Sequence, residues 1–319
     1  MNILITGASG FVGRALCKAP RTLDHKIRTV FRTHPGAKFD FQYVLVNDIN
    51  ADTDWAEALE GINVVVHLAA RAHIIGNNDP VSLDKINTTN TAGTLQLANT
   101  AANVGVKRFV FISSIGVNGS GTVTPFTEQA LANPCEPYAI SKLEAEQGLR
   151  EIAAKTGMEA VIVRAPLIYG PGCPGNFLRL LELVYKGMPL PLGSLKNSRS
   201  LIGVQNLVDF LIQCVEHPLA ANEMFLIADR PDISTPDLIR TLAQGMGRPS
   251  YLMQVPHGLV RGMTKLVGKQ ATFDKLCGSL QIDSSYSRRL LAWEQPVELK
   301  SGLLEVGRWY ASCKLNAKS

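Results

Sequence analysis

Residues 2–13 read NILITGASGFVG, and this stretch decides the fold. The apolar run at residues 2–6 is followed at once by Gly7, Gly10 and Gly13. Glycine permits a tight turn and lets backbone N–H groups approach a pyrophosphate that a Cβ would keep away. Because the motif follows a strand and precedes a helix, it predicts a dinucleotide-binding loop.

Downstream of this loop, apolar β-type runs alternate with helical stretches, which is typical of a parallel sheet built from βαβ units. Uninterrupted apolar runs, such as residues 64–66, suit strands that are buried on both faces. Strands are expected at residues 2–6, 26–31, 42–46, 63–67, 108–113 and 159–163. Helices are expected at residues 12–19, 54–59 and 81–104, after Pro137, and at 178–185, 207–216, 236–243 and 303–311. The predicted fold class is α/β, a Rossmann-type doubly wound parallel sheet.

After residue 163 the chain changes to connections rich in proline and glycine, such as residues 170–175. This change predicts two units. Residues 1–165 form the dinucleotide-binding domain. Residues 166–319 form mostly a smaller α/β substrate lobe, with some segments returning to the sheet.

The composition excludes several classes of protein. With 319 residues, 46% hydrophobic and 18% charged, the chain is neither disordered nor a membrane protein. The net charge of +5 is spread without a basic block, which argues against nucleic acid as a partner. Six cysteines and six histidines are scattered without metal-ligand spacing, so no metal is expected and the thiols are expected to be reduced. We therefore expect a cytoplasmic protein.

Tyr138 and Lys142 are four residues apart, so on a helix they share one face. A nearby ammonium, together with the charge of an oxidised nicotinamide, favours the tyrosine phenolate over the neutral phenol. The spacing therefore predicts that Tyr138 acts as an acid and base near neutral pH.

The glycine spacing, the Tyr138/Lys142 pair and the preceding strand end Ser113-Ser114 together resemble the extended short-chain dehydrogenase/reductase family over nearly the whole chain. The resemblance implies that Ser114 orients the substrate and that Asn90 organises the active site. It also implies an adenine contact at Asp48 and Ile49 and a pyrophosphate contact after His67. The implied catalytic residues are Ser114, Tyr138, Lys142 and Asn90. The implied cofactor-binding residues are Gly7, Ser9, Gly10, Phe11, Val12, Gly13, Arg32, Asp48, Ile49, Leu68, Ala69, Ala70, Tyr138 and Lys142.

The second expected strand is followed by Arg32, where members of this family that prefer NAD carry an acidic residue. An arginine would bind a ribose 2′-phosphate that a carboxylate repels. A solvated arginine at the end of a strand is an equally good interpretation. The cofactor is therefore expected to be NADP or NAD, with NADP modestly favoured.

On the substrate side, Asn176 and Arg199 match positions where nucleotide-sugar members of the family hold a diphosphate. The implied substrate-binding residues are Ser114, Tyr138, Asn176 and Arg199. Two departures from the family pattern, Leu167 in place of asparagine and Asn206 in place of aspartate, prevent the sugar contacts from being transferred.

The segments at residues 190–193, 206–209 and 278–293 resemble a narrower branch of the family. Its better-defined members look like 4-keto reductases that make UDP-N-acetylquinovosamine for bacterial surface polysaccharide, including O-antigen. The leading hypothesis is NAD(P)H-dependent reduction of a UDP-4-keto-6-deoxy-N-acetylhexosamine. A UDP-hexose 4-epimerase with tightly bound NAD is the alternative, and a non-catalytic dinucleotide-binding regulator is a minor one. The resemblance also suggests a homodimer formed by the helices around residues 91–102 and 141–153.

Overall fold

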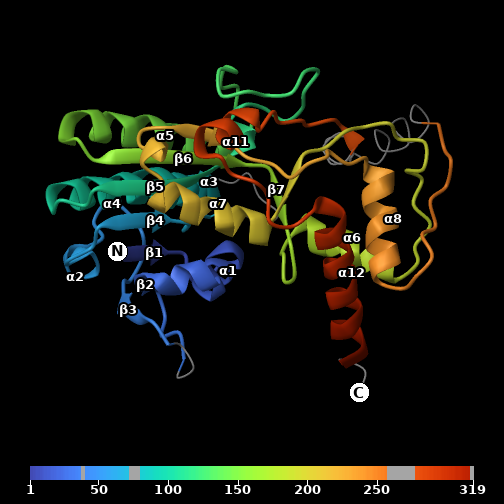
Figure 1. Cartoon of the computed structure of the whole chain (residues 1–319), viewed down its shortest axis with the longest axis horizontal. Coiled ribbons are helices and arrows are strands. Elements are labelled where there is room, and N and C mark those ends of the chain that lie inside the picture. The colour runs from blue at the N-terminus through green and yellow to red at the C-terminus, as the bar shows by residue number, and fades with distance from the viewer. Residues whose placement is uncertain (37–39, 72–79, 257–276, 317–319) are drawn as a thin grey trace.

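A computed structural model of the chain describes residues 1–36, 40–71, 80–256 and 277–316. Seven parallel strands form the main sheet in the order β3-β2-β1-β4-β5-β6-β9 (Figure 1). These strands are β1 (Asn2–Thr6), β2 (Lys26–Phe31), β3 (Gln42–Leu45), β4 (Val64–His67), β5 (Arg108–Ser114), β6 (Glu159–Ala165) and β9 (Met224–Leu226). The order reverses beside β1, as in doubly wound folds, so ligands are expected at the carboxyl ends of β1 and β4. The predicted Rossmann-type fold class is confirmed.

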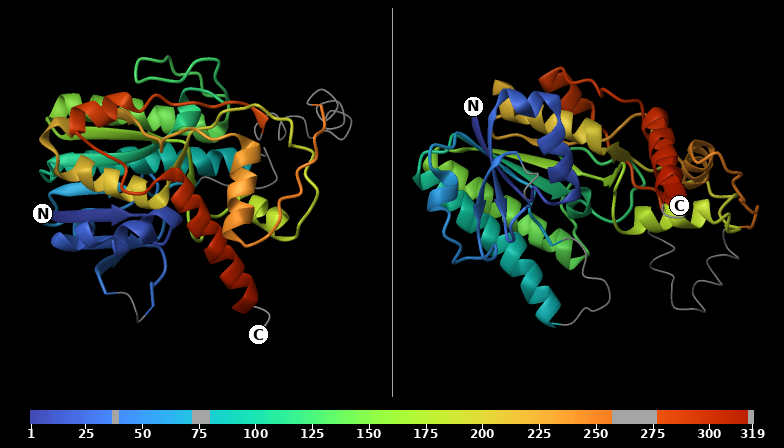
Figure 2. Two further views of the ribbon diagram at one scale, coloured as in Figure 1. Left: turned by 45° about the vertical axis from the view of Figure 1, so that its right-hand side comes forward. Right: turned by 90° about the horizontal axis from the view of Figure 1, so that it is seen from below.

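Helices cover both faces of the sheet because strand side chains alternate between its two sides. Ile3 and Ile5 pack with α1 (Phe11–Lys18) and α7 (Val204–Glu216). Leu4 packs on the other face, with α2 (Ala56–Leu59), α4 (Gly93–Asn103) and α5 (Pro137–Thr156). Figure 2 shows the sheet between these two helical layers. Such double coverage explains why the strands are continuous apolar runs.

The helix predicted over residues 81–104 is wrong in one respect. It consists of α3 (Pro80–Asn87) and α4, joined by a π-helical turn at Thr88–Ala92. Such turns often occur at functional sites. Three strands of three residues each were not predicted: β7 (Leu167–Tyr169), β8 (Leu201–Gly203) and β9. Segments this short cannot show a strand period.

A separate apolar cluster lies beside the sheet (Figure 1). It is formed by α6 (Asn176–Tyr185), α8 (Thr235–Gly245) and α12 (Leu299–Asn316), next to the two-stranded sheet of β7 and β8. Segments beyond residue 165, namely α7, β9 and α11 (Ser285–Leu291), return to the main sheet. The division at residue 165 stays a prediction. Within the described residues, no helix has the length and apolar character needed to cross a bilayer.

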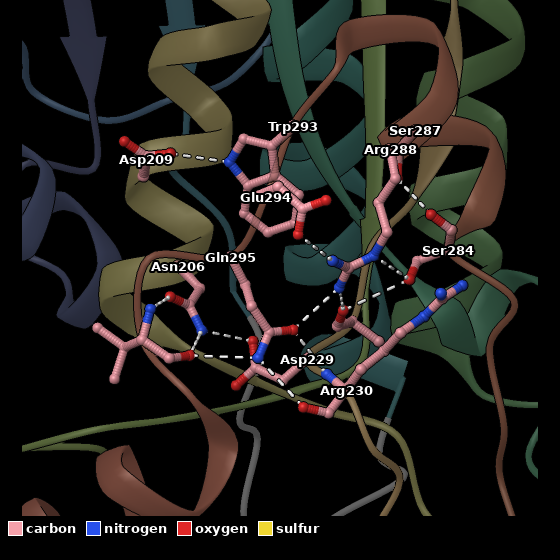
Figure 3. A network of polar contacts seen from close by, with 12 residues as sticks. Asn206, Asp209, Asp229, Arg230, Ser284, Ser287, Arg288, Trp293, Glu294 and Gln295 are labelled. Carbon is pink, nitrogen blue, oxygen red and sulfur yellow. Dashed lines mark hydrogen bonds and ion pairs between the residues drawn. The ribbon is translucent and has the colours of Figure 1, made fainter.

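Residues 284–297, which we call the C-terminal crossing, run from the main sheet back toward α12 (Figure 3). Trp293 Nε1 donates to Asp209 Oδ2 of α7 at 2.8 Å. Asn206 Nδ2 donates to the Val297 carbonyl at 2.8 Å, and Val297 N donates back to Asn206 Oδ1 at 2.9 Å. These bonds fix the crossing to α7.

Candidate active site

The glycine loop lies at the carboxyl end of β1, and its geometry requires glycine at two positions. Gly7 has a φ of +71°, and a Cβ there would lie 2.7 Å from the Ala69 backbone nitrogen. A Cβ at Gly13 would lie 2.2 Å from the Gly7 carbonyl oxygen. Gly10 is the N-cap of α1 and supplies no side-chain cap. The first N–H groups of α1 therefore lack a side-chain acceptor, which fits a dinucleotide pyrophosphate.

The other predicted cofactor residues surround this loop. The backbone of Leu68 and Ala69 packs closely against Gly7. Ser9, Gly10 and Ala70 are exposed, whereas Phe11, Val12 and Leu68 are partly buried. Phe11 packs against both the sheet cluster and the α6/α8/α12 cluster, so it lies at the junction of the two.

The predicted adenine contact lies on a turn that packs against α4. A Cβ on Gly93 would lie 2.7 Å from Ile49 Cγ2, so the helix and the turn meet without a gap. Asp48 Oδ1 lies 3.9 Å from Arg32 Nη1 and 3.9 Å from Arg71 Nη2. Sequence reasoning missed Arg71, although it directly follows the segment from His67 to Ala70. Arg32 is exposed and faces a carboxylate as well as a second arginine.

Ser114, Tyr138 and Lys142 lie at the carboxyl end of β5 and on the first two turns of α5. The Lys142 side chain is 1% exposed, and its Nζ donates to the Ile112 carbonyl of β5 at 2.8 Å. Lys142 Nζ also lies 5.9 Å from the centroid of the Tyr138 ring. Ser114 Oγ accepts from Gly116 N at 3.1 Å. The helix and the strand end are thus held together through Lys142.

Burial shifts the pKa values of both Tyr138 and Lys142. Burial raises the pKa of Tyr138 to about 12. Burial also lowers the pKa of Lys142 to about 7, although Glu146 opposes this change. Desolvation disfavours the charged form of both groups. The protein by itself therefore keeps Tyr138 neutral, and the predicted phenolate, which depends on an oxidised nicotinamide as well as on Lys142, stays a prediction.

Asn90 is fully buried in the π-helical turn. Its Oδ1 accepts from Arg71 N at 2.8 Å, and its Nδ2 donates to Arg71 O at 3.2 Å and to Ser141 Oγ at 3.1 Å. Ser141 precedes Lys142 on α5, and its Oγ also donates to the Tyr138 carbonyl at 2.8 Å. Asn90 thus holds α5 through Ser141.

A buried ion pair lies one helical turn beyond Lys142, and sequence reasoning missed it. Arg164 Nη2 lies 2.5 Å from Glu146 Oε2, and their side chains are 6% and 2% exposed. Ser113 Oγ donates to Glu146, and Arg164 Nη1 donates to Asn118 Oδ1 at 3.0 Å. No local pattern in the sequence signals this pair, because Glu146 lies on α5 and Arg164 on β6.

The two predicted diphosphate ligands lie outside the sheet. Asn176 is exposed and is the first residue of α6. Arg199 Nη1 donates to the Gly278 carbonyl at 2.9 Å. Asn206, which replaces the aspartate common in the family, is fully buried and donates to Asp229 Oδ1 at 2.7 Å. An aspartate there would place one carboxylate against another, so the amide belongs to the scaffold.

A doubly wound parallel sheet that carries this glycine loop at β1 and the Ser114, Tyr138 and Lys142 cluster at β5 defines a dinucleotide-dependent enzyme of the short-chain dehydrogenase/reductase class. Comparison with known families places the chain more narrowly. The model of the NAD dependent epimerase/dehydratase family matches residues 3–228, and the chain belongs to that family.

Individual relatives agree with this assignment. A UDP-glucose 4-epimerase from Vibrio cholerae is 42% identical over 312 residues, covering 96% of this chain and 94% of its own length. An N-acetyl-alpha-D-glucosaminyl-diphospho-ditrans,octacis-undecaprenol 4-epimerase from Escherichia coli O157:H7 is 28% identical, covering 89% of this chain and 88% of its own. The crystal structure of a UDP-glucuronic acid 4-epimerase from Bacillus cereus in complex with NAD superposes with a TM-score of 0.79 at 22% identity, covering 98% and 99% of the two chains. The last of these supports the fold alone.

Proposed function

We propose that this protein is a UDP-hexose 4-epimerase that retains NAD through its catalytic cycle. The observation that carries the proposal is the 42% identity, over nearly the full length of both chains, with the Vibrio cholerae UDP-glucose 4-epimerase. The glycine loop, which a Cβ at Gly7 or Gly13 would block, supports a bound dinucleotide. The sequence alone had favoured a 4-keto reductase, and the comparisons back the epimerase better.

Each residue of the cluster has a chemical task in this proposal. As its phenolate, Tyr138 Oη takes the proton from the C4 hydroxyl of the sugar and later returns it, while Ser114 Oγ hydrogen-bonds to the same oxygen. Bound NAD would accept the hydride from C4 and give it back to the opposite face of the ketone. Lys142 carries a positive charge below its pKa of about 7, and in that form it makes loss of the phenol proton less costly. Because burial raises the pKa of Tyr138 to about 12, this charge is needed in the loaded site.

We propose that Asn176 and Arg199 bind the diphosphate of the substrate. The relatives from Vibrio cholerae and Escherichia coli O157:H7 support this, since each is named as a 4-epimerase of a sugar carried on a diphosphate. An arginine fork suits phosphate oxygens. Arg199 already donates to the Gly278 carbonyl through Nη1, which fixes the orientation of its guanidinium plane.

The reductase hypothesis keeps one observation in its favour, the arginine at the end of β2. Arg32 would attract a 2′-phosphate, but Asp48 lies 3.9 Å from its Nη1 and opposes a further negative charge. If Arg32 selects NADP, Arg32→Asp shifts the ratio of NADP to NAD affinities toward NAD. An unchanged ratio removes the argument for NADP.

We further propose a homodimer formed by α4 and α5. Leu95 of α4 packs directly against Gly148 of α5, where a Cβ would lie 2.5 Å from Leu95 Cδ2. This close contact makes one combined helical surface, on which Ile140 is 41% exposed. Sedimentation equilibrium of the wild type and of Ile140→Glu tests the proposed dimer. If both proteins have the mass of a single chain, the dimer proposal is wrong.

The deciding experiment supplies UDP-galactose without any added reductant and follows UDP-glucose by proton NMR. An epimerase reaches an equilibrium mixture, and NAD is released when the protein is denatured. Tyr138→Phe is expected to abolish turnover while its NAD content stays that of the wild type. Stoichiometric oxidation of NADH or NADPH by UDP-4-keto-6-deoxy-N-acetylglucosamine, without epimerisation of UDP-galactose, would establish the reductase instead.

A further inference from the structure

His67, the last residue of β4, is fully buried between the glycine loop and the π-helical turn. Its Nδ1 lies 2.7 Å from Thr6 Oγ1, the hydroxyl directly before Gly7. Its Nε2 lies 2.9 Å from Thr94 Oγ1 on α4. Thr94 Oγ1 in turn donates to the Asn90 carbonyl at 2.7 Å. One imidazole therefore joins two parts of the site through hydroxyl groups.

The direction of every hydrogen bond in this chain follows from the acceptors at its end. The Asn90 carbonyl can only accept, so the single hydroxyl proton of Thr94 is used there. Thr94 Oγ1 must then accept from His67, which places the imidazole proton on Nε2. His67 Nδ1 is consequently an acceptor, and the Thr6 hydroxyl donates a hydrogen bond to it. The order is fully determined for a neutral imidazole.

The surroundings favour that neutral form. Burial, together with the positive charge of Lys142, lowers the pKa of His67 to about 3. The ring also lies near two aromatic side chains of β5, with centroid distances of 5.8 Å to Phe109 and 5.9 Å to Phe111. His67 therefore has a fixed plane and a fixed proton, unlike a flexible amide of similar polarity.

We propose that His67, as its Nε2–H tautomer, is a positioning residue that couples the glycine loop to the catalytic helix. At one end, Thr6 Oγ1 also accepts from Ala69 N at 3.4 Å, and the Ala69 backbone packs closely against Gly7. At the other end, Asn90 holds Ser141, the residue before Lys142. A change at either end of the chain of hydrogen bonds is transmitted to the other. The activity readout below rests on the proposed epimerase function.

Thr94→Val tests this coupling, because valine keeps the shape of threonine and removes the hydroxyl. It leaves the His67 Nε2–H and the Asn90 carbonyl without their partner in a buried site. We expect the affinity for NAD, measured on protein freed of nucleotide, and kcat for UDP-galactose each to fall about tenfold. Thr94→Ser is expected to restore both. Thr100→Val is the matched control, since Thr100 Oγ1 makes the same i−4 bond, to the Gln96 carbonyl at 2.9 Å, outside the site.

The tautomer is measured directly in the wild type by ¹⁵N NMR of labelled histidine, with His67→Gln assigning the signal. A non-titrating Nε2–H imidazole between pH 5 and pH 8 is expected. An Nδ1–H tautomer, or wild-type NAD affinity and kcat in Thr94→Val, would overturn the proposal, and the NMR result decides if Thr94→Val does not fold. Failure of the wild type to bind NAD or to convert UDP-galactose refutes the proposed function but leaves the tautomer result to be judged by itself.

Discussion

Lys142→Met is expected to remove a pH dependence of stability that the wild type shows between pH 7 and pH 9. Burial lowers the pKa of Lys142 to about 7, whereas a lysine in an unfolded chain has a pKa of about 10.4. Between these values the unfolded chain binds a proton that the folded chain does not bind. The free energy of unfolding therefore rises with pH, by up to about 1.4 kcal/mol per pH unit.

Over two pH units, the wild type gains about 2 to 3 kcal/mol relative to Lys142→Met. The methionine also leaves the Ile112 carbonyl without its donor, but that loss does not depend on pH. Tyr138 does not interfere, because its raised pKa lowers stability only above about pH 10, where an unfolded tyrosine begins to ionise.

The assay is urea unfolding of nucleotide-free protein, followed by circular dichroism at pH 7, 8 and 9. Lys155→Met is the matched control, since Lys155 is exposed near the end of the same helix. The control is expected to keep the slope of the wild type. A constant difference in unfolding free energy between the wild type and Lys142→Met across this range would refute the reasoning, because Lys142 would then keep its proton on folding.

Three further outcomes are expected. Gly7→Ala is expected to abolish NAD binding measured by calorimetry. Gly105→Ala is the control and is expected to bind NAD as the wild type does, because Gly105 also has a positive φ, +84°, but has open space around it. Equal NAD binding by the two variants would contradict the steric argument. Glu146→Gln removes the charge that pairs with buried Arg164 and is expected to lower the free energy of unfolding by about 3 to 5 kcal/mol. Glu151→Gln, on the exposed side of the same helix, is expected to have little effect. A loss of unfolding free energy below about 1 kcal/mol in Glu146→Gln would contradict a tightly paired Arg164 and Glu146. Arg199→Ala raises KM for UDP-galactose much more than it lowers kcat, and an unchanged KM would exclude the diphosphate role.

The sequence predicted the first six strands of the sheet because most of them are short apolar runs that alternate with helical stretches. The glycine loop was predictable for the same local reason. Local patterns could not show the π-helical turn around Asn90, because it interrupts an otherwise continuous helical period.

The polar interior of the site was not predictable to the same degree. The pairing of Glu146 with Arg164 joins α5 to β6, and only the fold brings those two residues together. The spacing of Tyr138 and Lys142 reports a neighbouring charge but not the loss of water that raises the pKa of Tyr138 to about 12. Arg71 was missed because its relation to Asp48 depends on how two loops meet.

The route of the C-terminal crossing has a consequence for synthesis of the protein on the ribosome. The core beneath α1 and α7 includes Leu291 and Trp293, which follow β1–β6 in the chain and are made after them. Until they emerge, the nascent chain lacks part of the cover for one face of the sheet. A fragment ending near residue 165, although it contains six of the seven strands, is therefore expected to expose an apolar surface and to need a chaperone during translation.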